Sequence, residues 1–188
     1  MFTRVLVDAN VLASRTLRDW ILMLQVQASG MFTTCWTEDI LAETIHAMRK
    51  RNPAVAGSSI TQVADTMRQV MGERIDAFEV IAFPDIRDEF DLHVHAAAIA
   101  GGVDMLVTLD SDFLELPTGV ADELPYEILS PDSFLVLVDD SGPEHVREVL
   151  SQQWEYWRRR DPSTDLPQRL RNANCPEFAE RVYRHQRA

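Results

Sequence analysis

The chain has 188 residues, of which 46% are hydrophobic and 26% are charged, which is typical of one globular domain with a sizeable core. Its net charge of −12 argues at first against a nucleic-acid binder, because such proteins usually carry basic patches. No apolar run approaches the roughly 20 residues of a transmembrane helix, and the first residues lack the features of a signal peptide, so we expect a protein without membrane contact. Its two cysteines, Cys35 and Cys175, are too few for a disulfide framework or a zinc site, which favours free thiols in a reducing cytoplasm.

Short runs of apolar, aromatic or β-branched residues predict five strands, over residues 5–7, 32–36, 78–81, 105–109 and 126–129. Between the strands, apolar residues spaced three and four positions apart predict helices over about 16–28, 37–51 and 59–71, and an alanine-rich helix over 91–100. Pro131 suits the start of a helix after the fifth strand. Strands that alternate with helices in this way predict an α/β fold with a mostly parallel sheet.

The last part of the chain predicts helices only. Residues 143–157 form an amphipathic pattern whose apolar face holds Val146, Val149, Leu150, Trp154 and Trp157. Residues 161–188 predict two further short helices joined by turns. We therefore expect two regions, an α/β domain over 1–142 and a small helical C-terminal extension over 143–188.

Acidic residues follow the predicted strands where ligands usually bind. Asp8 comes directly after the first strand, Asp110 follows the fourth, and Asp112 lies two residues further on. In parallel α/β sheets, ligands bind at the carboxyl ends of strands near the point where the strand order reverses. Because strands one and four are neighbours in common sheet orders, we expect these carboxylates to converge.

Two more acids can reach the same edge. Asp91 opens the helix before the fourth strand, and Glu43 lies in the helix after the second, where Ile40 and Ala47 place it beside the buried face. Clustered inward carboxylates repel one another unless a cation binds them, and hard ions such as Mg²⁺ or Mn²⁺ prefer oxygen ligands. Such a metal activates water for attack on a phosphodiester, which suits nucleases and phosphatases alike.

Most of these residues also have a purely structural explanation. The alternatives are a helix cap at Asp91, turn residues at Asp110 and Asp112, and an ion pair with His46 for Glu43. Asp8 is hardest to explain by packing. Asn10 and Thr108 flank the same edge and can orient a carboxylate or hold a metal-bound water, or serve as ordinary turn and strand residues. For His93 and His95 we favour structural roles.

Several segments together resemble the PIN domain family. They are residues 5–12 (Val-Leu-Val-Asp-Ala-Asn-Val-Leu), 17–19, 36–43, 91–98 and 107–113, and the resemblance spans about residues 3–140. It is closest to the VapC-like branch with a helical C-terminal extension. It implies a three-layer αβα sandwich around a mostly parallel five-stranded sheet, and a Mg²⁺- or Mn²⁺-dependent endoribonuclease that cuts tRNA or ribosomal RNA. It also implies a VapB-type antitoxin as protein partner, and a homodimer.

Carried over by position, Asp8, Glu43 and Asp91 match three acids of the family's metal site. The fourth falls at Asp110 or Asp112, because this chain has two acids where the branch often has an asparagine and a slightly longer spacing. The choice between Asp110 and Asp112 is therefore left open. This chain also departs from the branch at Leu92, where a basic residue is usual.

Arginines supply candidate phosphate contacts. Arg15 and Arg18 follow the first motif, and Arg18 can equally pair with a nearby acid; Arg158 and Arg159 lie beside two tryptophans, although a basic run is more often a solvated surface. Residues 1–142 hold 9 Lys and Arg against 23 Asp and Glu, whereas residues 143–188 hold 9 against 7. Two alternatives to a nuclease are a phosphatase, although Asn10 then leaves no second acid, and a non-catalytic scaffold that binds protein or RNA.

Overall fold

The computed structural model describes residues 2–80, 83, 86 and 91–187. Its centre is a five-stranded, all-parallel sheet with the strand order β3-β2-β1-β4-β5. The strands are β1 (Thr3–Val7), β2 (Phe32–Trp36), β3 (Glu73–Arg74), β4 (Met105–Val107) and β5 (Glu127–Leu129). The predicted α/β fold with a parallel sheet is thus confirmed.

Eleven helices occur in the described part of the chain. They are α1 (Ala9–Leu12), α2 (Arg15–Gln27), α3 (Glu38–Arg51), α4 (Gly57–Val70), α5 (Leu92–Ala100), α6 (Ser111–Leu114), α7 (Thr118–Ala121), α8 (Pro131–Ser141), α9 (Pro143–Arg160), α10 (Leu166–Asn172) and α11 (Pro176–His185). The long helices lie where apolar periodicity predicts them, and Thr37 caps α3 by accepting a hydrogen bond from the Ile40 amide.

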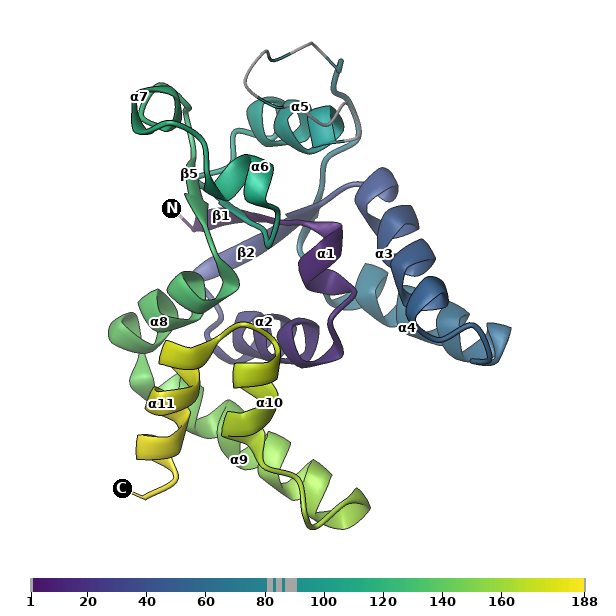
Figure 1. The fold of residues 1–188 in the computed structure, drawn as a ribbon, viewed down its shortest axis with the longest axis vertical. Coiled ribbons are helices and arrows are strands. Elements are labelled where there is room, and N and C mark those ends of the chain that lie inside the picture. Colours follow the sequence, from purple (N-terminus) through teal and green to yellow (C-terminus); the bar gives the residue numbers. More distant parts are fainter. Residues whose placement is uncertain (1, 81–82, 84–85, 87–90, 188) are drawn as a thin grey trace.

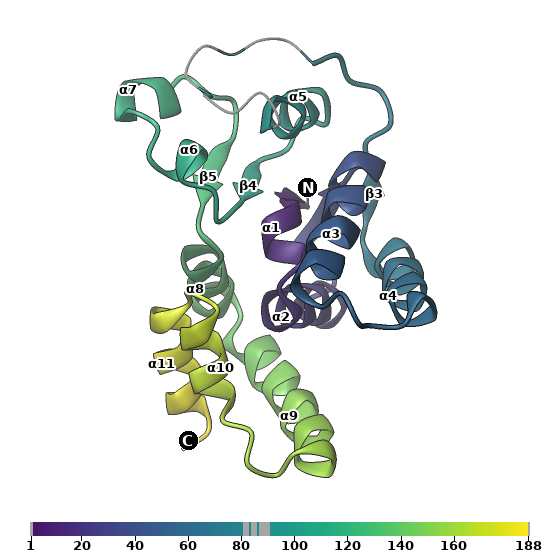
Figure 2. The same ribbon diagram turned by 45° about the vertical axis from the view of Figure 1, so that its right-hand side comes forward.

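Helices cover both faces of the sheet. In Figure 1 and Figure 2, α5 lies on one side of β1 and α2 on the other. The strands between them are fully apolar at their centres, with Val5 and Leu6 of β1 and Leu106 of β4 each 0% exposed. Burial on both faces explains why these strands read as continuous apolar runs rather than as alternating ones.

The strand order places a reversal next to β1. The chain passes from β1 to β2 and β3 on one side, and then returns through α5 to β4 on the other side of β1. The carboxyl ends of β1 and β4 are therefore neighbours at the reversal point, where open parallel sheets bind ligands. Asp8 and Asp110 follow these two strands, as the sequence predicts.

The third strand is the main correction to the predicted elements. We expected it at residues 78–81, but β3 is Glu73–Arg74, and residues 78–80 have no regular structure; residue 81 lies outside the described part of the chain. Pairing with Cys35 and Trp36 of β2 defines β3. The short helices α1, α6 and α7 were not predicted either, because one helical turn is too short to show apolar periodicity.

The C-terminal helices pack onto the rest of the chain. Trp20 of α2 and Phe178 of α11 make an edge-to-face contact with ring centroids 5.1 Å apart, and both rings are buried. Asp132 of α8 accepts hydrogen bonds from the amides of Glu177 and Phe178, and so caps the start of α11. The boundary at residues 142 and 143 stays a prediction. Among the described helices, none has the length and apolar character that crossing a membrane requires.

Candidate active site

Asp8 is a buried carboxylate between β1 and α1. Asp8 is only 4% exposed. Its Oδ1 accepts a 2.6 Å hydrogen bond from the Ala9 amide, so Asp8 is the N-cap of α1. The chain turns from strand to helix at this residue, which fixes the carboxylate at the sheet edge. The strand before Asp8 and the helix after it together determine the direction in which its side chain points.

Two polar side chains hold the other oxygen of Asp8. Thr108 Oγ1 and Asn10 Nδ2 each donate to Asp8 Oδ2 at 2.6 Å. Asn10 Oδ1 in turn accepts from the Leu109 amide at 3.0 Å, which ties α1 to the chain that follows β4. Asn10 and Thr108 thus orient the carboxylate, one of the two roles that we considered for them.

Burial raises the pKa of Asp8, and the nearby negative charge of Asp110 raises it further. The hydrogen bonds from Thr108 and from the Ala9 amide oppose this shift and lower the pKa, as does the charge of His93. The two acids are linked through Thr108, whose Oγ1 accepts from the Asp110 amide at 2.9 Å. A cation at this edge would relieve the unfavourable charge on a buried carboxylate.

Asp110 and Asp112 lie together at the start of α6. Asp110 Oδ1 accepts from the Asp112 amide at 2.8 Å and so caps the helix, and both residues are half-buried. Asp110, for which we considered a turn role as the structural alternative, is thus the cap of a short helix, and its charge also acts on Asp8. This electrostatic contact favours Asp110 as the fourth acid, although the choice stays a prediction.

Asp91 lies directly before α5, and Glu43 lies in α3. Asp91 precedes α5 and its side chain makes no capping hydrogen bond with that helix, so the helix-cap alternative is not what the structure shows. Glu43 Oε2 lies 3.5 Å from His93 Nε2, which replaces the expected alternative pairing with His46. The Glu43 side chain is 47% exposed, so it lies at the rim of the site rather than facing the core.

His93 is the residue that the sequence reasoning missed. Its side chain is 14% exposed, pairs with Glu43 and acts electrostatically on Asp8. A signal was present, since His93 follows Asp91 by two positions in the first turn of α5. His95, on another side of the helix, has the expected structural role: its Nδ1 lies 2.7 Å from the hydroxyl of Tyr126.

The donor set fits a hard divalent cation. Every acid offers oxygen, and the ionised Asp8 carboxylate has about four acceptor positions, of which described donors fill three. In the described part of the chain, no group of three or more His, Cys, Asp or Glu side chains already has the spacing of a metal site. That Asp8, Asp91, Glu43 and Asp110 or Asp112 would together hold the ion stays a prediction.

The predicted arginine contacts divide into two kinds. Arg18 is 8% exposed and donates to the Leu12 carbonyl at 2.7 Å, so it supports the end of α1, and the charge of the adjacent Asp19 also acts on it. Arg15 is half exposed, and pairs with Asp19 at 3.4 Å. Arg158 and Arg159 lie in the last turn of α9, whose end is far from α1 in both Figure 1 and Figure 2. The structure does not bring them to the carboxylates.

A groove of about 1010 Å³ begins at Ala13, the residue that follows α1. It lies between α2, α3, α4 and α9, and its apolar floor includes Leu22, Val26 and Val63. Arg15 and Arg18 line it as well, on the part of α2 that follows α1.

Comparison with known proteins gives one match. A family model described as PIN domain matches residues 4–112, which is more than half of the chain. The match contains Asp8, Glu43, Asp91, Asp110 and Asp112. No curated protein and no solved structure matches significantly.

Proposed function

The chain belongs to the PIN domain family, whose members are generally metal-dependent nucleases, and on that premise we propose that it is a Mg²⁺- or Mn²⁺-dependent endoribonuclease. The observation that carries the proposal is the environment of Asp8. A buried carboxylate is held by Thr108 and Asn10 beside the charge of Asp110, at the reversal point of a parallel sheet. Structural needs alone rarely place an acid there.

The side chains have distinct roles in this proposal. Asp8, Asp91, Glu43 and one of the acids at 110 and 112 hold the metal, which when bound activates water and neutralises charge on the phosphate. Thr108 and Asn10 fix the rotamer of Asp8 through its Oδ2. His93 orients Glu43 from α5, and so couples the rim acid to the buried one.

The same geometry disfavours a phosphatase. An aspartyl-phosphate enzyme needs a free nucleophilic oxygen and a second acid for proton transfer two residues on. Asn10 stands at that second position, and both ends of its amide are engaged, by Asp8 and Thr108 on Nδ2 and by the Leu109 amide on Oδ1.

The proposal extends to a cytoplasmic toxin of the VapBC type, with tRNA or ribosomal RNA as substrate, a VapB-type antitoxin as partner, and a homodimer as assembly. The resemblance in the sequence supports these points. The groove beside α1 also supports a protein partner, because its apolar floor suits protein side chains better than phosphates. Buried Cys35 and Cys175 are consistent with a reducing compartment.

The test is cleavage of total tRNA and ribosomal RNA by the purified chain, with Mg²⁺, with Mn²⁺ or with EDTA. We expect cleavage only with metal, and its loss in Asp8→Asn and Asp91→Asn. Asp65→Asn, which changes an exposed acid of α4 paired with Arg68, is the matched control and should cleave like the wild type. If neither metal supports cleavage of either RNA, the non-catalytic scaffold replaces this proposal; a small adjacent reading frame would separately support the antitoxin.

A further inference from the structure

The C-terminal end of α9 carries exposed aromatic rings. The buried positions of this helix are Val146, Val149, Leu150 and Gln153, and beyond them Trp154 is 47% and Tyr156 37% exposed. Figure 1 and Figure 2 both show this end of α9 at one extremity of the molecule. Aromatic rings on such a protruding end are accessible to a ligand.

Arginines from three helices lie over the rings of Tyr156 and of the neighbouring Trp157. The guanidinium of Arg15 in α2 lies 5.7 Å from the ring centre of Tyr156 and 4.8 Å from that of Trp157. Arg160 lies 4.4 Å from the Tyr156 ring, and Arg169 of α10 lies 3.9 Å from the Trp157 ring. These five residues, Arg15, Tyr156, Trp157, Arg160 and Arg169, form an alternating arginine–aromatic ladder.

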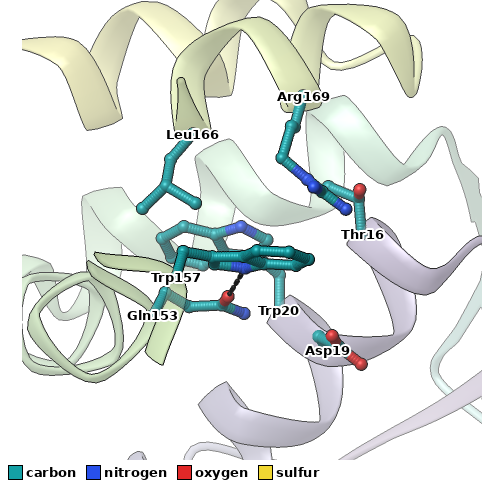
Figure 3. Close-up of a pocket in the computed structure, with 7 residues that line it drawn as sticks. All are labelled: Thr16, Asp19, Trp20, Gln153, Trp157, Leu166 and Arg169. Carbon is teal, nitrogen blue, oxygen red and sulfur yellow. Dashed lines mark hydrogen bonds between the residues drawn. The ribbon is translucent and has the colours of Figure 1, made fainter. Parts of the chain in front are cut away.

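Packing explains one part of the ladder. Figure 3 shows Trp157 close to Arg169 and Trp20, with its Nε1 donating to Gln153 Oε1 at 3.1 Å. The cavity that these side chains line has a volume of only about 10 Å³, room for a single water, so the contact is a filled joint between α2, α9 and α10. Trp157 is therefore part of the packing, as its place on the predicted apolar face indicates, whereas Trp154, predicted on the same face, is exposed.

The neighbouring arginines are not needed for that joint. Within the described residues, the side chains of Arg158 and Arg171 have no polar or ring partner. Arg159 is 80% exposed and pairs with Glu155 at 3.5 Å, a surface contact that contributes little to stability. Residues 154–172 hold five arginines against three acids, whereas the whole chain has a net charge of −12.

This combination matches the chemistry of single-stranded nucleic acid. Unpaired bases stack on exposed aromatic rings, and nearby arginines bind the phosphates. On α9, the guanidinium of Arg160 lies over the Tyr156 ring four residues before it, and Trp154 and Arg158 have the same spacing on the helix surface. An acidic peptide would be attracted by the charges but would make no use of the rings.

We propose that the ladder, with the flanking Trp154, Arg158 and Arg159, is a second RNA-binding surface that holds an unpaired stretch of the RNA away from the carboxylates. This inference rests on the proposed ribonuclease function. Arg15 is the ladder residue that lies nearest to Asp8 in the sequence, seven positions after it, and it donates a 2.7 Å hydrogen bond to the Tyr156 hydroxyl. RNA that reaches from the ladder to Asp8 would be held at two points, which favours long or structured substrates over short ones.

The test measures binding without cleavage. A fluorescein-labelled 20-nucleotide polyuridylate is titrated with the full chain in EDTA at several salt concentrations, by fluorescence anisotropy. The variants are Arg158→Ala/Arg159→Ala and Trp154→Ala, all exposed positions whose folding is checked by thermal denaturation. The matched control, called the α11 control, is Arg184→Ala in α11 combined with Arg187→Ala just after it, which removes the same charge and also separates Arg187 from the Tyr183 ring, 4.6 Å away.

We expect the double arginine variant to bind roughly 10- to 30-fold more weakly at 0.1 M salt, and to reduce the slope of log affinity against log salt by about 1.4, the value for two single-strand phosphate contacts. Trp154→Ala should weaken binding by about 5-fold or more without changing the slope, because stacking releases no counterions. The α11 control should bind like the wild type.

Three results would overturn the inference: equal losses in the α9 and α11 variants, wild-type affinity in both α9 variants, or displacement of the RNA by poly-L-glutamate as readily as by unlabelled polyuridylate. The last would show a surface for acidic protein. Cleavage by the wild-type chain with metal is scored separately. If the wild type cleaves RNA and the α9 variants bind it unchanged, only the proposal of a second surface is wrong. If the ladder binds RNA but the wild type does not cleave it, only the proposed nuclease function is wrong.

Discussion

Thr108 is the residue whose replacement tests the site most directly. It is 0% exposed, and its hydroxyl group makes three hydrogen bonds at the sheet edge. Oγ1 donates to Asp8 Oδ2 at 2.6 Å, and accepts from Asn10 Nδ2 at 3.2 Å and from the Asp110 amide at 2.9 Å. Thr108→Val keeps the shape of the side chain and removes all three bonds.

The expected loss of stability follows from these contacts. A hydrogen bond to a charged group contributes about 1.5–3 kcal/mol, and an unsatisfied buried amide costs about 1–3 kcal/mol. Because Asn10 still donates to Asp8 in the variant, we expect a loss of about 3 kcal/mol rather than the full sum. Thr108→Ser, the matched control, keeps the oxygen and removes one buried methyl group, worth about 1 kcal/mol.

The assay is equilibrium unfolding in urea with EDTA, followed by circular dichroism. Thr108→Val should have a lower midpoint than Thr108→Ser at an unchanged slope, and should also lose most RNA cleavage with metal. If the valine and serine variants unfold within about 0.5 kcal/mol of each other, the hydroxyl does not hold the site together and the reasoning above is wrong.

Three further predictions concern single residues. Since burial raises the pKa of Asp8, the metal-free protein should lose stability as the pH rises from about 4 through the folded-state pKa of that carboxyl group. In thermal denaturation with EDTA, Asp8→Asn should reduce this dependence of stability on pH. The same pH profile in the variant and the wild type would contradict the burial argument. His93→Gln should slow RNA cleavage about 10-fold with little change in stability, whereas the exposed control His46→Gln should not, and equal rates would remove His93 from the site. Asp132→Ala removes the cap of α11 and should lower the free energy of unfolding by about 1 kcal/mol in urea; an unchanged midpoint would show that the cap adds nothing.

The sequence predicts the buried strands well and the edge strand poorly. β1 and β4 are apolar because both faces are covered, so their pattern is visible in the chain. β3 consists of Glu73 and Arg74, both exposed, and exists only because their backbone pairs with β2. Such a short, charged edge strand has no hydrophobic pattern, and it limits pairing with other chains. Phe78 is apolar for a different reason, since it packs against the core without entering the sheet.

In the site, too, the sequence predicts features that depend on neighbouring residues, but not contacts between residues that are far apart in the chain. Asp8 follows from the sequence because strand and turn are adjacent in the chain. The partner of Glu43 does not, because periodicity gives the side of a helix but not what lies opposite: His93 on α5 meets Glu43 at 3.5 Å. We expected Arg18 to contact a phosphate or an acid, but it lies so close to the end of α1 that its guanidinium donates to the Leu12 carbonyl.

The distribution of charge gives a physical reason for two separate surfaces. A net charge of −12 repels RNA at long range, and the carboxylates at the sheet edge add to that repulsion until a cation binds. A basic, aromatic contact placed away from the acids lets RNA bind before the metal site is engaged. Arg15 and Tyr156 of the ladder also line the apolar groove between α2 and α9. A protein bound in that groove would therefore cover part of the ladder, and block RNA binding without touching Asp8.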